Sequence, residues 1–313
     1  MDQSNQTTVT NFLLLGLSNV PHLQALYFSI LLIVYIVTFL ANTLIITVVS
    51  LKSQLHKPMY FFLSNLSWVD ILLSTSIVPK ILSNTLSRDK SITFMGCAIQ
   101  VYMLGAVGAT ECVILGIMAY DRYAAICHPL HYNKTMNKYV CRRMTFGSWA
   151  VSFLSGFPRV YLTFQLPFCR SKRINRYFCE MPPLFHLSCK ETLFIEILVY
   201  IETGLIVLAS FLLTLVSYVF IIFTILKISS ARGKYKTFST CASHVTVVTL
   251  FYGNILITYM QPKSNYSPER DRALSLLYTA VTPMLNPVIY TLRNNYCSDL
   301  MKRVDPSKAC LLK

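Results

Sequence analysis

The sequence predicts an all-helical membrane protein in which seven helices form one bundle. Only 13% of its 313 residues are charged and 54% are hydrophobic, whereas a soluble domain usually carries about 25% charged residues. Seven mostly apolar stretches reach the roughly 20 residues that a helix needs to cross a bilayer. Helices satisfy their backbone polar groups internally, as lipid requires, and the alternating pattern of a membrane barrel is absent. The predicted spans are 24–51, 58–82, 96–120, 141–163, 195–226, 237–260 and 271–292.

The positions of the basic residues indicate how this bundle is oriented. With the N-terminus outside, more than half of the 28 Lys and Arg residues fall on the inner segments, as the positive-inside rule expects. We therefore expect an extracellular N-terminus over 1–23, the bundle over 24–292 and a cytoplasmic tail with a short amphipathic eighth helix over 293–313. The net charge of +15 forms no continuous basic face, which argues against nucleic acid as a partner.

Two kinds of covalent site follow from that orientation. Asn5 begins an Asn-Gln-Thr sequon, which is usable only on the outer side, so we expect it to be glycosylated. Four cysteines, Cys97, Cys169, Cys179 and Cys189, fall on the same oxidising side, where free thiols are unusual. Four cysteines allow three pairings, and the residues themselves do not choose among them.

Polar residues inside predicted spans are costly in lipid, so each is a functional candidate. Asp70 in the second span and Glu111 in the third lie at similar depths. They either share a cation or a proton, or form hydrogen bonds with Asn42 and Asn286 in a polar core that fixes packing. Glu202 in the fifth span either faces a ligand cavity or extends to the outer surface.

Five motifs occur in order along the chain and resemble those of the odorant (olfactory) receptor family of rhodopsin-like G-protein-coupled receptors. They are LHKPMYFFLS (55–64), MAYDRYAAIC (118–127), SY (217–218), KTFSTCASH (236–244) and PMLNPVIYTLRN (283–294). The resemblance covers about residues 10–303. Small departures at Ala41, Ala124 and Thr237 leave the fold unaffected and bear only on coupling efficiency.

The resemblance implies a plasma-membrane receptor, not an enzyme, that binds a small odorant and activates a stimulatory G protein to raise cAMP. It implies the disulfides Cys97–Cys179 and Cys169–Cys189, and it makes Asp70 and Glu111 sodium-site carboxylates, with no other cofactor. The residues that it assigns to the activation switch and G-protein coupling are Asp121, Arg122, Tyr123, Tyr218, His244 and Tyr290.

We expect the ligand cavity in the outer half of the bundle, mostly apolar with a few orienting polar groups. The third span has a stripe of small residues at helical spacing, which leaves room for a ligand or permits close helix packing. The expected ligand contacts are Leu104, Gly105, Gly108, Ala109, Cys112, Glu202, Ile206, Tyr252, Ile255, Leu256, Tyr259, Leu276 and Thr279.

Three other classes of protein compete with this interpretation. A non-olfactory chemoreceptor with the same fold has the same sequence features. A transporter often shows paired broken helices in matching halves, and no such pairing is visible. A membrane enzyme needs a reactive group, but the sequence contains no HExxH or GxSxG pattern and no evident nucleophile–base pair.

Overall fold

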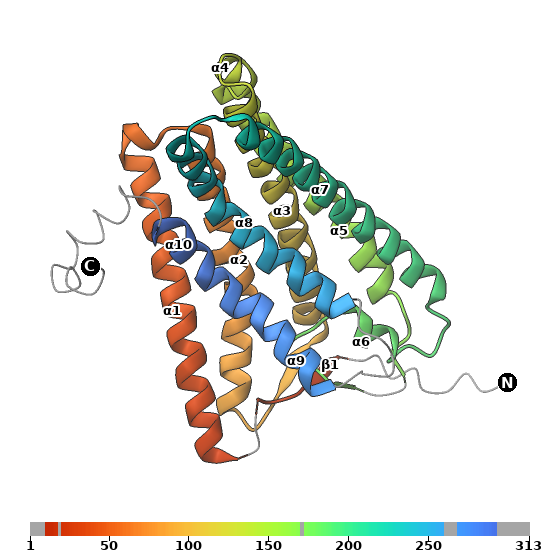
Figure 1. Cartoon of the computed structure of the whole chain (residues 1–313). Helices are drawn as coiled ribbons and strands as arrows, with labels where there is room; N and C mark the ends of the chain where they lie inside the picture. The colour runs from red at the N-terminus through yellow and green to blue at the C-terminus, as the bar shows by residue number, and fades with distance from the viewer. Residues whose placement is uncertain (1–9, 18–19, 170–171, 260–267, 293–313) are drawn as a thin grey trace.

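The computed structural model describes residues 10–17, 20–169, 172–259 and 268–292, and these form a bundle of long helices (Figure 1). Each of the seven predicted spans falls on a long helical segment. The segments are α1 (Pro21–Leu51), α2 (Pro58–Leu86), α3 (Phe94–Cys127), α5 (Lys138–Phe164), α7 (Leu193–Lys227), α8 (Ala231–Tyr259), and α9 (Pro268–Leu276) continued by η3 (Leu277–Val281) and α10 (Thr282–Leu292). The shorter elements are η1 (Ser53–Leu55), α4 (Tyr132–Thr135) and α6 (Met181–Phe185).

Six of these segments are long and apolar enough to cross a membrane, and α5 differs from them in composition. Its 27 residues extend about 40 Å at 1.5 Å per residue, which is sufficient for a span. Arg142 and Arg143 near its start are exposed, whereas Arg159 is buried. Because α5 packs against α2, α3 and α7, it belongs to the bundle although its hydropathy is lower.

The outward faces of the helices are apolar and the inward faces contain small polar residues. Along α7 the exposed side chains include Leu205 and Phe223, while Ser210, Thr214 and Ser217 are buried at helical spacing. This arrangement is the reverse of a water-soluble helix, whose apolar stripe faces the core. It is the arrangement expected of a helix whose outer surface contacts lipid.

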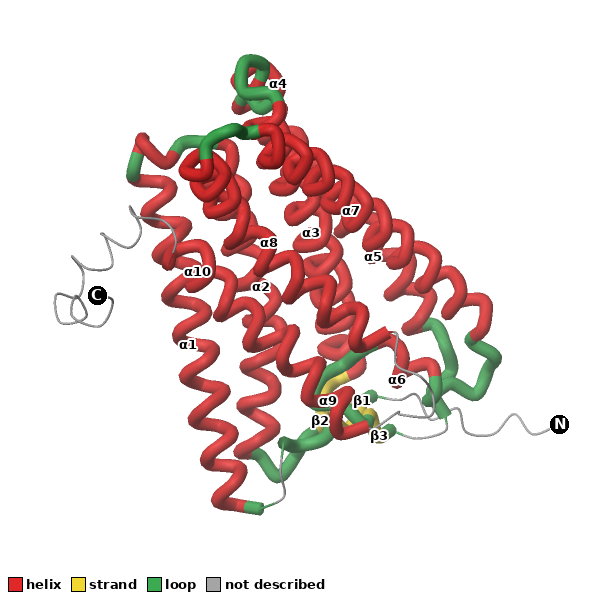
Figure 2. The backbone as a smooth tube through the Cα atoms, in the orientation of Figure 1, coloured by secondary structure: helices red, strands yellow, loops and turns green. Residues whose placement is uncertain are grey.

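A three-stranded sheet covers one end of the bundle, which we call the sheet end (Figure 2). Strand β1 (Asn11–Leu14) lies between β2 (Ser91–Thr93), to which it is antiparallel, and β3 (Arg173–Ile174), to which it is parallel. Phe12 and Leu14 point inward from β1, and the Phe12 ring meets Phe168 edge to face with centroids 5.4 Å apart. The sequence predicted an extracellular segment here but no sheet. The opposite end contains α4, and we call it the α4 end.

The seventh segment contains a π-helical turn and two prolines. A π-helical turn, η3, precedes Pro283, and the backbone N–H of Thr282 bonds to the Leu277 carbonyl. Pro287 has no N–H to donate to the carbonyl of Pro283. That oxygen accepts instead from the Asn42 side-chain nitrogen on α1 at 3.1 Å, so a neighbouring helix satisfies the group that proline leaves free.

Candidate functional site

Two disulfides connect the loop before α7 to the sheet end of the bundle. Cys97 at the start of α3 bonds to Cys179, with Cα atoms 5.5 Å apart, and Cys169 bonds to Cys189 at a Cα separation of 5.8 Å. These are the two pairings that the family resemblance implies. Cys97 and Cys179 are fully buried in a second hydrophobic cluster beneath the sheet, together with Phe12.

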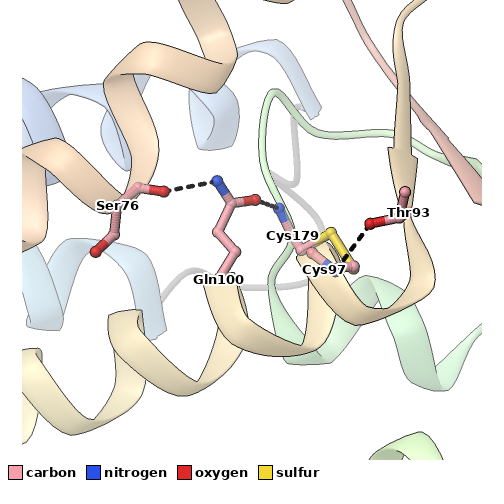
Figure 3. Close-up of a disulfide and its surroundings, with 6 residues drawn as sticks. Ser76, Thr93, Cys97, Gln100 and Cys179 are labelled. Atoms are coloured by element: carbon pink, nitrogen blue, oxygen red, sulfur yellow. Dashed lines mark hydrogen bonds between the residues drawn. A yellow bond between two sulfur atoms is a disulfide. The ribbon is translucent and has the colours of Figure 1, made fainter.

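Gln100 supplements the first disulfide, and the sequence analysis did not single it out (Figure 3). Its Nε2 donates to the Ser76 carbonyl on α2 at 3.0 Å, and its Oε1 accepts from the Cys179 backbone N–H at 2.9 Å. Only 4% of the residue is exposed. One side chain therefore joins α2, α3 and the disulfide-bonded loop. A carboxamide three residues after a bridging cysteine was the only signal in the sequence.

The structure brings several of the predicted ligand contacts together between α3, α7, α8 and η3. The Cys112 sulfur and the Tyr252 hydroxyl are 3.6 Å apart, and Tyr252 also meets Phe211 edge to face. A Cβ atom on Gly108 would lie 3.1 Å from the Tyr278 hydroxyl. Small residues on α3 thus face aromatic side chains from two other helices, as an apolar recognition site requires.

The other predicted ligand contacts are placed less uniformly. Leu104, Ile255 and Leu276 pack at the margin of the main core, Ala109 and Ile206 are partly buried, and Thr279 is buried with its hydroxyl bonded to the Ser275 carbonyl. Leu256 is 48% exposed and belongs to neither core cluster, so the structure does not place it with the rest. Tyr259 ends α8, and its side chain lies outside the described residues.

A separate hollow lies between α2, α3 and the sheet. It measures about 420 Å³ and includes Lys80, Ser76 and Gln100 among its lining residues. Lys80 donates to the Ser91 carbonyl at 2.6 Å. None of the predicted ligand contacts lines this hollow, so it is distinct from the expected cavity.

Arg159 on α5 is a buried cation that the sequence analysis missed. It is only 6% exposed, and its Nη1 donates to the Thr203 hydroxyl on α7 at 3.1 Å. Its Nη2 lies against Gly105, one of the predicted ligand contacts, so closely that a Cβ at that position would overlap it. On α7, Glu202 next to Thr203 has one buried carboxylate oxygen with no hydrogen-bond partner among the described residues.

The two intramembrane acids each form one hydrogen bond deeper in the bundle. The Asn286 side-chain nitrogen donates to Asp70 Oδ1 at 2.9 Å, and the Tyr278 hydroxyl donates to Glu111 Oε2 at 3.3 Å. The second oxygen of each carboxylate is buried without a hydrogen-bond partner in the described part of the chain, as are the amide oxygens of Asn42 and Asn286. Among the described residues, no group of three or more His, Cys, Asp and Glu side chains is placed so that it could hold a metal ion.

The predicted switch residues lie toward the α4 end and connect three helices. His244 on α8 contacts the Leu115 carbonyl through Nε2 at 3.1 Å and the Tyr218 hydroxyl through Nδ1 at 2.7 Å. A carbonyl only accepts, so Nε2 carries the proton and Tyr218 donates to Nδ1. This histidine thereby joins α8 to α3 and α7. The hydroxyl of Tyr290 and the Nε of Arg122 are buried without a partner among the described residues.

Asp121 and Tyr123, which flank Arg122, are each bonded to a residue that follows α3. The Tyr132 hydroxyl on α4 donates to Asp121 Oδ1 at 2.8 Å, and the Tyr123 hydroxyl is 2.9 Å from His128 Nε2. Burial raises the pKa of Tyr132 above its ordinary value, so the phenol stays protonated and remains the donor. The bond between Tyr132 and Asp121 joins α4 to the end of α3.

This fold and this site define a multi-pass helical membrane protein with the architecture of a rhodopsin-like receptor. The family model described as "Olfactory receptor" matches residues 31–308. The chain is 47% identical over 295 residues to human olfactory receptor 10A3, covering 94% of each chain. It is 43% identical over 304 residues to olfactory receptor 1f45 of Rattus norvegicus, covering 97% of each, and 44% identical over 305 residues to olfactory receptor 5AR1 of Mus musculus, covering 97% of this chain and 98% of the other.

The chain belongs to the olfactory receptor family. It is a G-protein-coupled signalling receptor of the plasma membrane and not an enzyme, which excludes the transporter and enzyme alternatives.

Proposed function

We propose that this receptor binds a small, mostly apolar odorant in the sheet-end half of the bundle and activates a stimulatory heterotrimeric G protein at the α4 end, raising cAMP. The observation that supports this site is that Cys112 and Gly108 on α3 lie close to Tyr252 and Tyr278, which come from two other helices. Burying apolar surface contributes about 25 cal/mol per Å², so a compact volatile gains most of its affinity from such contacts.

The sheet end is placed outside the cell in this proposal. Both disulfides lie there, and disulfides persist in oxidising compartments. The α4 end exposes Arg142 and Arg143, as the positive-inside rule expects of a cytoplasmic face. The predicted glycan at Asn5 and the amphipathic helix within 293–313 fall outside the described residues, and both remain predictions.

Signal transfer requires that the odorant bind one arrangement of the bundle more tightly than another. Helix α8 provides the physical connection, because Tyr252 lies at the ligand region and His244 lies eight residues earlier, roughly 12 Å along the helix. A ligand that displaces Tyr252 moves the helix that also contacts Leu115 and Tyr218 through His244. That movement opens the region around Arg122 to the G protein.

A sodium ion shared by Asp70 and Glu111 is a further part of the proposal. Four buried oxygens there, one each from Asp70, Glu111, Asn42 and Asn286, have no hydrogen-bond donor among the described residues. Oxygen atoms are the ligands that hard cations take, so this donor set suits a small cation. The bound charge would balance the two carboxylates and favour the arrangement of helices in which they lie close.

The test is an odorant-panel screen in cells that report cAMP, with Arg122→Ala as the silent variant. Arg142→Ala is the matched control, because Arg142 is an exposed arginine at the same end of the bundle. We expect odorant-evoked cAMP in the wild type and the control, and none in Arg122→Ala at equal surface expression. A response that survives Arg122→Ala contradicts the assigned switch, and a wild type silent to the whole panel contradicts the proposed function.

A further inference from the structure

The hollow between α2, α3 and the sheet has the size and the lining of a second binding site. Its volume of about 420 Å³ falls within the range of small-molecule sites, roughly 300–1,000 Å³. Among the described residues that line it, Lys80 is the only charged one, so no acid balances that cation within the lining. Ile99 and Met103 on α3 give the hollow an apolar wall. A cation beside an apolar wall suits a ligand with an anionic head and an apolar chain.

Lys80 has more donors than the protein around it uses. An ammonium group has three N–H donors, and Lys80 Nζ gives one of them to the Ser91 carbonyl at 2.6 Å. No carboxylate in the described part of the chain forms an ion pair with it. Asp89 is the nearest acid along the chain, but its carboxylate accepts from the N–H and the hydroxyl of Ser91 and does not line the hollow. A partly buried positive charge therefore has two N–H groups to offer a ligand.

The depth of Lys80 along α2 places it where the headgroups of a bilayer meet the acyl chains. The helix has 29 residues and extends about 43 Å, close to the roughly 40–45 Å of a bilayer with its headgroups. Lys80 precedes Leu86, the last residue of α2, by six residues, or about 9 Å, whereas each headgroup layer is roughly 5–7 Å deep. Met95 and Ile99 on α3 are 65% and 56% exposed, as expected of side chains that face lipid. The hollow therefore borders both lipid and the polar interface.

We propose that this hollow binds the phosphate group of a membrane phospholipid from the leaflet at the sheet end. The phosphodiester pairs with the Lys80 ammonium, because lysine binds phosphate as a point charge. Asn11 and Thr93 add an amide and a hydroxyl to the lining, and the acyl chains leave the hollow past Ile99 and Met103 into the bilayer. The inference is independent of the proposed odorant function, since none of the expected odorant contacts lines this hollow.

A lipid bound in the hollow would contact the residues that hold the sheet end together. Gln100, which bridges α2, α3 and the disulfide-bonded loop, lines the hollow with Ser76 (Figure 3). Thr93 lines it too, and its Oγ1 accepts from the Gly96 N–H at 3.1 Å at the start of α3. A ligand that binds the folded receptor but not the unfolded one stabilises the fold by mass action. The bound phospholipid should therefore raise the temperature at which the receptor unfolds.

The experiment follows thermal unfolding of the full-length receptor, purified in an uncharged maltoside detergent, during titration with three probes. They are dioleoyl phosphatidylcholine, dioleoylglycerol, which has the same chains without the phosphate, and inorganic phosphate. Phosphatidylcholine has no net charge, so the basic net charge of the chain does not attract it by itself. We expect it to raise the unfolding midpoint, with a half-maximal concentration at least ten-fold below that of either other probe.

Three variants of lysine assign the effect to the hollow. Lys80→Gln removes the charge but keeps a donor for the Ser91 carbonyl, and it should raise the half-maximal concentration of phosphatidylcholine roughly 10- to 100-fold, as expected for one charge-assisted hydrogen bond. Lys80→Arg, which keeps a cation that binds phosphate, should restore the response. Lys190→Gln is the matched control, because Lys190 is an exposed lysine of the loop at the same end, and it should respond as the wild type does.

Three outcomes overturn the inference. They are an unchanged half-maximal concentration in Lys80→Gln, a dioleoylglycerol effect equal to that of phosphatidylcholine, and a full shift with inorganic phosphate alone, which would identify a free anion as the ligand. If Lys80→Gln does not fold, Asn11→Ala replaces it. Asn11 is exposed and lines the same hollow, so its loss should raise the half-maximal concentration roughly 2- to 10-fold, and no change would equally overturn the site. The assay uses neither odorant nor G protein, so its failure leaves the proposed function standing.

Discussion

Replacing Gln100 by Met tests whether the bonds around the first disulfide hold the sheet end together. Methionine has a similar shape but forms neither hydrogen bond of the carboxamide, which bridges the Ser76 carbonyl and the Cys179 N–H. The bond to the Ser76 carbonyl contributes about 1 kcal/mol, and the buried Cys179 N–H left unsatisfied costs about 1–3 kcal/mol. The expected loss is about 2–4 kcal/mol, or roughly a 30- to 700-fold lower ratio of folded to unfolded receptor.

The assay is thermal unfolding of the purified receptor, followed by the accessibility of its buried free cysteines to a fluorescent thiol reagent. We expect the midpoint for Gln100→Met to fall by several degrees. Ile99→Met is the matched control, because Ile99 is the adjacent residue on α3 and is 56% exposed. If Gln100→Met unfolds at the temperature of the wild type, the bridge contributes no stability and the reasoning is refuted.

Three further predictions address the sheet, the ligand region and the ion site. Phe12→Ala should lower stability by about 3–5 kcal/mol, because Phe12 is fully buried, whereas Leu13→Ala should change thermal unfolding little since Leu13 is 40% exposed. Gly108→Leu should abolish the cAMP response at normal surface expression, because even a Cβ there would lie 3.1 Å from the Tyr278 hydroxyl; an unchanged dose–response curve places the site elsewhere. Replacing Na⁺ by choline should shift agonist EC50 in the wild type but not in Asp70→Asn, and equal shifts in both would argue against the ion.

Much of the fold was predictable because lipid imposes a simple rule on sequence. Long apolar stretches marked the helical segments, and the structure places a helix on each of them. The sheet was not predictable in the same way. Strand β1 has four residues, β2 three and β3 two, and β1 pairs with partners far along the chain. Strands so short carry no readable alternation, and their pairing depends on loops that the disulfides hold in place.

The candidate site was predictable from the sequence only where the size of a residue restricts what can lie next to it. Small residues on α3 indicated close approach of other groups, and the structure places Tyr278 and Arg159 against Gly108 and Gly105. Which residues of the other helices face this stripe depends on how each helix is rotated about its axis. The sequence does not fix that rotation where a helix is apolar on almost every face, so it did not separate Tyr278 from Leu256. The exposed Leu256 is the consequence.

Arg142 and Arg159 show what decides the outcome for a polar residue in a membrane helix. Both are arginines on α5, and sequence alone allows each either to extend to the interface or to be buried. Arg142 is near an end of the helix and is exposed. Arg159 is also near an end, yet it is buried, because Gly105 leaves space for its guanidinium and Thr203 accepts its hydrogen bond. The decisive features are therefore on two other helices, more than forty residues away along the chain.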